Sequence, residues 1–378
     1  MKSMSNPRTE NCTTCHHLKI DTCILRNELI ELPFWTTCVN QNIDTLTPSG
    51  TLFSLINETK NKVITHHQIP FFNGSRVNTY KGEGLDDTYL GLKTMDETTL
   101  VFEDVNEYLS FYKKEQEKKK HFILGAIIGD CIGSVFEFHN FKSTDFHLFG
   151  KKTTFSDDSV LTLATMDSIL NHVDYTKVYQ TFGRNYTNRG YGGNFLYWIY
   201  MDEPEPYLSF GNGSAMRVSP VGWAYDNIDD VMKQAKRSAE VSHNHPEGIK
   251  GAQATASAIF LARTGKGKAE IKEFIEVMFG YDLNRTIESI RTEYSFDESC
   301  QGSVPEAIIA FLESTNFEST IRLAISLGGD SDTIACIAGS IAEAFYKEIP
   351  EYVIENTLKL LPDEFIKLIE DFSSKYGK

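Results

Sequence analysis

Apolar residues recur at three- and four-residue spacing through the last two-thirds of the chain, and this pattern constrains the fold more than any other feature. Clear instances are residues 159–170, 248–263, 268–279, 332–349 and 354–372. Such spacing gathers apolar side chains on one face of an α-helix. Small residues repeat at the same spacing between Ala335 and Ala342, which allows helix backbones to approach closely. We therefore expect a mainly α protein in which residues 119–378 form an all-α body.

The first 118 residues follow a different pattern. From about residue 48 to residue 105, short strand-like runs lie between turns rich in Gly and Asn, and they predict a small β-containing module. The runs are residues 51–56, 61–72, 73–78 and 98–104. A short helix is expected over residues 105–120, and it ends in a run of charges. Such a run is typical of a solvated helix end or a linker, so we place the domain boundary between residues 1–118 and 119–378.

Four of the seven cysteines lie within the first 38 residues, at C-x2-C-x7-C-x14-C spacing. Four thiolates satisfy Zn²⁺ in a closed tetrahedral site, and a short loop-rich segment gains folding energy from it. The alternative is that these cysteines are reduced and free, because the spacing departs from paired C-x-x-C motifs. His16 or His17 could also replace one ligand. The candidate zinc ligands are Cys12, Cys15, Cys23 and Cys38.

The charge balance excludes some classes of partner. The chain has 37 Lys and Arg against 52 Asp and Glu, so the formal net charge is −15, of which −13 lies in residues 121–378. This charge repels phosphate backbones and anionic membrane surfaces. No apolar run reaches the roughly 18 to 20 residues of a membrane-spanning helix, and the first residues lack the apolar region of a signal peptide. We expect a cytoplasmic protein that binds neither membrane nor nucleic acid.

Two clusters of carboxylates and hydroxyls stand immediately before apolar helical stretches. One is Ser156-Asp157-Asp158-Ser159 and the other is Asp330-Ser331-Asp332-Thr333. Helix capping is one explanation, since Asp and Ser satisfy the free amides of a helix start. The alternative is a metal site, because a cap needs one side chain and four acids gathered together would repel one another without a cation. Oxygen ligands without His or Cys suit Mg²⁺ or Mn²⁺, and two such ions about 4 Å apart could activate a water.

Five segments in order, residues 125–138, 155–164, 209–224, 242–256 and 326–346, strongly resemble the motifs of the ADP-ribosylglycohydrolase family, which includes the dinitrogenase-reductase-activating glycohydrolase. The resemblance covers roughly residues 121–350. It implies an orthogonal all-α catalytic domain and hydrolysis of the glycosidic bond between ADP-ribose and a modified protein side chain, with arginine linkage favoured.

The resemblance also implies roles for individual residues. Where the family usually has Thr-Asp-Asp-Thr, this chain has serines, which keep the hydroxyl oxygen. A pair of Mg²⁺ or Mn²⁺ ions is implied at Ser156, Asp157, Asp158, Asp330, Asp332 and Thr333. The candidates for acid, base or water activation are Glu137, Asp157 and Asp330. The substrate-binding candidates are Gly192, Phe195, Asn212, Gly213, Ser214, Met216, Arg217 and His243.

Two further readings stay open. A non-catalytic protein that binds ADP-ribose or another nucleotide could use the same scaffold, although retention of all four metal-type aspartates and Glu137 favours an enzyme. The expected partner is an ADP-ribosylated protein. Residues 1–118 could in addition dock on an ADP-ribosyltransferase, which would give immunity against an ADP-ribosylating toxin by blocking it as well as by reversing its damage.

Overall fold

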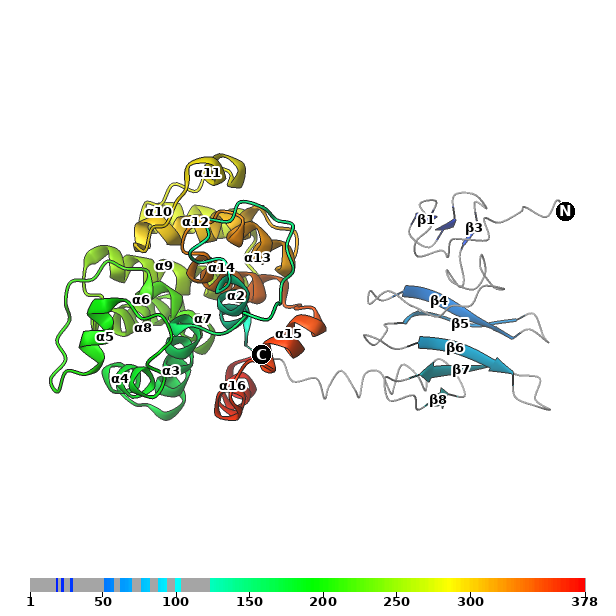
Figure 1. Ribbon diagram of the computed structural model, residues 1–378. Helices are drawn as coiled ribbons and strands as arrows, with labels where there is room; N and C mark the ends of the chain where they lie inside the picture. The colour runs from blue at the N-terminus through cyan, green and yellow to red at the C-terminus, as the bar shows by residue number, and fades with distance from the viewer. Residues whose placement is uncertain are drawn as a thin grey trace. The chain divides into compact units, whose positions relative to one another are not determined.

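The computed structural model describes residues 123–377 in full and, within residues 1–122, the backbone of eight strands. The chain divides into two compact units, Met1–Lys119 and Lys120–Lys378, and Figure 1 draws both. Of the candidate zinc ligands, only the backbone of Cys23 is described, in the strand Thr22–Cys23. The other three, and the predicted helix over residues 105–120, lie outside the described residues. No helix in the described part is long and apolar enough to cross a membrane.

The strands of the first unit form three antiparallel sheets, in the orders β1-β2-β3, β4-β5 and β6-β7-β8. Four of them, β4, β5, β6 and β8, fall on or overlap the runs that the sequence predicts as strands, whereas β7 was not predicted. Their bounds are β1 Leu18–Lys19, β2 Thr22–Cys23, β3 Glu28–Leu29, β4 Thr51–Asn57, β5 Lys62–Ile69, β6 Arg76–Lys81, β7 Thr88–Lys93 and β8 Thr99–Phe102.

The second unit is helical, and residues 123–377 contain no strand, which confirms the predicted all-α body. Its helices are α2 Gly125–Gly133, α3 Asp157–Asn171, α4 Tyr175–Asn185, α5 Gly193–Ile199, α6 Gly213–Met216, α7 Ser219–Ala224, α8 Ile228–Glu240, α9 Pro246–Arg263, α10 Lys268–Phe279, α11 Ile287–Glu293, α12 Cys300–Glu313, α13 Phe317–Ile325, α14 Ser331–Tyr346, α15 Glu351–Leu358 and α16 Asp363–Tyr376.

The ends of these helices follow from local chemistry. Helix α10 has the predicted bounds and stops at Gly280, whose φ of 67° costs a glycine little. The last apolar stretch, expected to be helical from Ile354 to Phe372, is two helices. Pro362 stands between them as the N-cap of α16, because proline cannot donate a backbone hydrogen bond inside a helix.

Helix α14 is the centre of the body. It packs against α2, α9, α12 and α13, and Figure 1 shows α2 and α14 side by side in the middle of the helical unit. A Cβ atom added at Gly125, Gly129 or Gly133 of α2 would lie 2.0 to 2.4 Å from backbone atoms of α14. These three glycines, spaced by four residues along one face, therefore bring the two helix backbones into direct contact.

A buried carboxyl group fixes the start of α2. The Glu343 side chain, 1 % exposed on α14, accepts hydrogen bonds from the backbone N–H of Leu124 at 2.9 Å and of Gly125 at 2.8 Å. These amides lie at the helix N-terminus, where no intrahelical acceptor exists. The contact sets the position of α2 along α14, and both helices carry residues of the site described below.

Candidate active site

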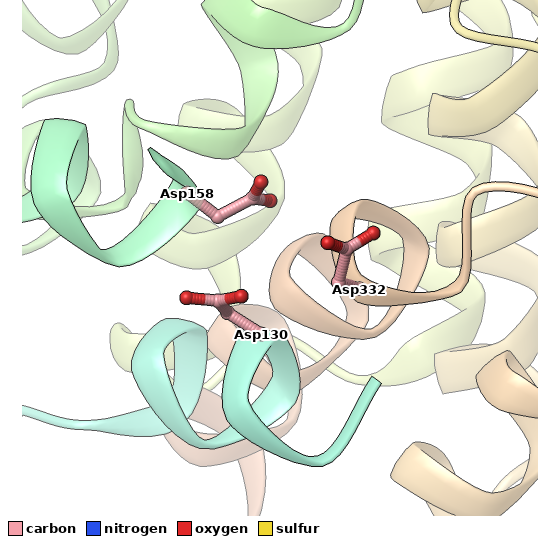
Figure 2. A group of neighbouring side chains, drawn as sticks. All are labelled: Asp130, Asp158 and Asp332. Atoms are coloured by element: carbon pink, nitrogen blue, oxygen red, sulfur yellow. The ribbon is translucent and has the colours of Figure 1, made fainter. Parts of the chain in front are cut away.

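Three helices bring one carboxylate each to a common point. Asp130 lies near the end of α2, Asp158 in the first turn of α3 and Asp332 in the first turn of α14. One oxygen of each lies within 4.8 Å of the others, and Figure 2 shows the three carboxylates around a shared space. All three residues are at most 3 % exposed. The sequence-predicted clusters before α3 and α14 therefore meet in space.

A second group of carboxylates adjoins the first through Asp332. Glu137, in the segment after α2, and Asp330 each place an oxygen within 4.8 Å of an oxygen of Asp332 and of each other. Asp330 Oδ2 accepts a hydrogen bond of 2.6 Å from Asn212 Nδ2. This contact ties the start of α14 to the residue that precedes α6.

Helix capping accounts for only part of the two clusters. Ser156 is the N-cap of α3, and its Oγ accepts a hydrogen bond of 3.2 Å from the backbone N–H of Asp158. Asp330 occupies the N-cap position of α14 but makes no side-chain cap bond. The capping explanation therefore fits Ser156, but it does not explain why the acids Asp158, Asp330 and Asp332 are buried close together.

The acids are held in an environment that penalises their charge. Burial raises the pKa of Asp157, Asp158 and Asp332 well above the usual aspartate range, and neighbouring carboxylates raise it further. Burial also raises the pKa of Asp330. Asp158 Oδ1 is buried and has no hydrogen-bond partner in the described part of the chain. An unpaired acceptor among crowded acids is the arrangement that a bound cation would relieve.

Asp130 is one of the site residues that sequence reasoning missed. Its carboxylate accepts hydrogen bonds from the backbone N–H and the hydroxyl of both Ser156 and Ser159, with Ser156 Oγ at 2.6 Å. These bonds use its acceptor capacity, so Asp130 positions the start of α3. The available signal was an acid inside the small and apolar segment 125–133, where a charge needs a partner.

Glu137 and the aspartates at positions 157, 158, 330 and 332 line a cleft of about 230 Å³. Most of the predicted substrate-binding residues line this cleft, but Ser214 does not, because its hydroxyl donates a 2.7 Å hydrogen bond to the Gly248 carbonyl. Ser156 is also absent from the lining. The predicted residues that line it are Glu137, Asp157, Asp158, Asp330, Asp332, Thr333, Gly192, Phe195, Asn212, Gly213, Met216, Arg217 and His243.

The His243 ring lies against Gly213 in the cleft. A Cβ atom at Gly213 would lie 3.0 Å from His243 Nε2, so the missing side chain admits the ring. The other ring nitrogen, Nδ1, lies 2.8 Å from Ser242 Oγ. Burial lowers the pKa of His243 well below its usual value, and the Arg217 guanidinium lowers it further.

Two exposed residues of the cleft lining were not predicted. Phe296 is 47 % exposed and stacks with Phe138, 78 % exposed, at 6.2 Å between ring centroids. Glu298 lies beside them, exposed, in the same lining. The bridge between Gly211 and Ser299 holds this segment against the turn of residues 211–213. This pairing joins residues almost 90 positions apart, so no local signal in the sequence marks it.

Comparison with known proteins points to one family. A family model described as ADP-ribosylglycohydrolase matches residues 113–378. The chain is 28% identical over 313 residues to ADP-ribosylhydrolase ARH3 of Mus musculus, covering 61% of this chain and 84% of that protein. The ARH3 of Xenopus tropicalis is 27% identical over 302 residues, with 60% and 86% covered. A solved ADP-ribosylglycohydrolase-related protein complex is similar with a TM-score of 0.55 and 25% identity, covering 70% of this chain and 99% of that one.

Proposed function

The chain belongs to the ADP-ribosylglycohydrolase family, whose model matches residues 113–378, and from this premise we propose that it releases ADP-ribose from arginine side chains of modified proteins in a Mg²⁺-dependent reaction. As a member it is a hydrolase that acts on ADP-ribose glycosidic bonds. The finer proposal is carried by one observation: buried carboxylates line a cleft together with the exposed residues Phe296 and Glu298.

The donor set fits a pair of Mg²⁺ or Mn²⁺ ions. It consists of carboxylate and hydroxyl oxygens without His or Cys, which hard cations prefer. The proposed ligands are Ser156, Asp157, Asp158, Asp330, Asp332 and Thr333, and the unpartnered Asp158 Oδ1 supports this assignment. The cations would neutralise the crowded acids and orient ribose hydroxyls and a water.

Glu137 is the proposed acid or base. Burial raises the pKa of Glu137 to about 7, and Asp330 and Asp130 raise it as well. A carboxyl group with a pKa near the working pH can both donate and accept a proton, and glycosidic cleavage through an oxocarbenium-like state needs such a group. Asp157 and Asp330 are the other candidates, but Asp330 already accepts the hydrogen bond from Asn212. The better placed group is therefore Glu137.

The remainder of the cleft supports a nucleotide diphosphate. Gly211 and Gly213 line the cleft, and the His243 ring occupies the place that a side chain at Gly213 would take. Residues without side chains let a diphosphate approach the backbone of such a turn closely. His243 and Arg217 line the same part of the cleft, and Phe195 forms an aromatic wall. We assign the diphosphate to the turn and the adenine to the side of Phe195.

The proposed preference for arginine is supported by two exposed residues of the cleft. A guanidinium group stacks on aromatic rings and pairs with carboxylates. Phe296 offers the ring and Glu298 the carboxylate, both on the segment that the Gly211–Ser299 bridge holds in place. A serine-linked substrate would present neither a cation nor a planar group there.

The test uses the full chain and proteins ADP-ribosylated on arginine or on serine, with Mg²⁺ or with a chelator. We expect faster release from arginine, no release with chelator, and loss of release in Asp330→Asn and Asp332→Asn, whereas Asp371→Asn, an exposed aspartate on α16, stays active. Unchanged turnover in the first two variants would refute the metal site.

A second pair of variants tests the linkage. Phe296→Ala and Glu298→Gln should lower kcat/KM for the arginine-linked substrate by about tenfold, the equivalent of about 1.4 kcal/mol, and leave serine-linked turnover unchanged. Equal losses on both substrates, or faster release from serine in the wild type, would contradict the arginine assignment.

The predicted zinc site, transferase partner and toxin immunity rest on residues 1–118 and stay predictions, as does the cytoplasmic location. The Asp332→Asn variant distinguishes inhibition of a transferase from removal of the ADP-ribose that the transferase attaches. If residues 1–118 block the transferase, this catalytically inactive variant still inhibits it. Metal analysis of the full chain, purified without chelator, tests for zinc.

A further inference from the structure

A buried arginine, serine and histidine form a chain of hydrogen bonds behind the cleft. Arg217 Nη2 donates to Ser242 Oγ at 2.9 Å and to the Ser238 carbonyl at 2.8 Å. Ser242 Oγ lies 2.8 Å from His243 Nδ1. Arg217 and Ser242 are fully buried and His243 is 5 % exposed. None of these contacts involves the carboxylate cluster.

The direction of these hydrogen bonds follows from which groups can donate a proton. Arginine has only donors, so Ser242 Oγ must accept from Arg217. The serine hydroxyl then has one proton to donate, and His243 Nδ1 is the acceptor that the structure gives it. If Nδ1 instead carried a proton, the hydroxyl proton would lose this partner inside the protein, which costs free energy.

The charge nearby keeps the imidazole neutral. The Arg217 guanidinium is fixed in place, because it stacks over the Tyr179 ring at 4.1 Å from the centroid. A second positive charge on His243 would be buried beside it, and burial and Arg217 both lower the pKa of His243. A neutral ring with an unprotonated Nδ1 carries its proton on Nε2.

We propose that Ser242 is a positioning residue: held by Arg217, it fixes His243 as the Nε2–H tautomer, so that the cleft presents a neutral N–H donor beside Gly213. The acceptor would be a phosphate oxygen of the ligand, a step that rests on the proposed function. A neutral donor suits this place, because Nε2–H stays oriented at any pH where the ring is uncharged, whereas the other tautomer would turn a lone pair toward an anion.

The tautomer is tested by ¹⁵N NMR of the histidine rings in the full chain, with the His243 signals assigned from their loss in His243→Asn. We expect a protonated Nε2 and an unprotonated Nδ1 in the wild type. Ser242→Ala should mix or reverse the tautomers, and Ser242→Thr, which keeps the hydroxyl, should restore the wild-type pattern. The exposed His139 serves as the reference ring in every variant.

Binding of ADP-ribose supplies the second readout. Ser242→Ala should bind it about tenfold more weakly, as expected for one hydrogen bond to a charged group, and Ser242→Thr should recover most of this loss. A protonated Nδ1 in the wild type, or an unchanged tautomer in Ser242→Ala, would overturn the proposal. If the wild-type tautomer is as assigned but ADP-ribose does not bind, the proposed function fails and the role of Ser242 in fixing the tautomer stands.

Discussion

Replacing Glu343 by glutamine should change how the stability of the helical unit depends on pH. Burial raises the pKa of Glu343 to about 8 from an ordinary value of 4.5, although the N–H groups of Leu124 and Gly125 lower it in part. The folded chain therefore keeps this proton up to about pH 8, whereas the unfolded chain releases it near its ordinary value. The stability that the group contributes is complete below pH 4.5 and is lost as the pH rises toward 8.

The magnitude follows from proton linkage. Between the two pKa values the free energy of unfolding falls by about 1.4 kcal/mol per pH unit for one such group, which is about 4 kcal/mol between pH 5 and pH 8. Glu343→Gln removes this titration. Its amide cannot accept from both Leu124 and Gly125, so at pH 5 the variant should be less stable than the wild type by about 1 to 3 kcal/mol. At pH 8 the difference should shrink or reverse.

The assay is urea unfolding followed by circular dichroism of the helices, in chelator, at four values between pH 5 and pH 8. Glu348→Gln is the matched control, because Glu348 is exposed just beyond the end of the same helix. Asp332 lies eleven residues from Glu343 on α14, roughly 16 Å along the axis, so salt screens their mutual effect. Parallel pH profiles for wild type and Glu343→Gln would refute the reasoning.

Three further outcomes are expected. Gly129→Ala places a Cβ 2.0 Å from the Ala335 carbonyl oxygen and should lower the free energy of unfolding by about 1 to 3 kcal/mol. Gly150→Ala is the control, because Gly150 has open space around it and its replacement should have little effect. Urea titration measures the free energy of unfolding of both variants. Mg²⁺ should bind more tightly at pH 8 than at pH 6 and release protons on binding, because binding requires ionised carboxylates and their pKa is raised. Calorimetry at both pH values, in buffers of different ionisation enthalpy, measures the affinity and the number of protons released. An affinity that does not depend on pH would contradict this prediction. Asp130→Asn should weaken Mg²⁺ binding by about 10- to 100-fold without removing a proposed ligand, and equal affinities would contradict its positioning role.

The features that the sequence predicts are those whose signals are local. Helix α10 was predicted with both of its ends, since an apolar face and Gly280 mark it within thirteen residues. The two acid clusters were found because each is contiguous. The break between α15 and α16 was missed although Pro362 was visible, because the apolar spacing continues across it.

The features that the sequence did not predict depend on packing between distant segments. Asp130 gains its meaning from Ser156 and Ser159, which reach it only after α2 has packed beside α3. Phe296 and Glu298 join the cleft through the bridge to Gly211. The hydroxyl of Ser214 bonds to the Gly248 carbonyl because α6 packs on α9. No local sequence pattern indicates this side-chain orientation.

The glycines of α2 determine how far apart two acids of the site lie, although they have no side chains. Gly133 abuts the backbone of Asp332 itself, and Gly129 is next to Asp130. The separation between those two carboxylates is therefore set by direct contact of main chains, and any substituent on that face changes the size of the space between them. If every substitution in the chain were tested for ADP-ribose release, we expect replacements of Gly129 and Gly133 to reduce activity as strongly as replacements of the acids, although these glycines have no side chain that could contact the ligand.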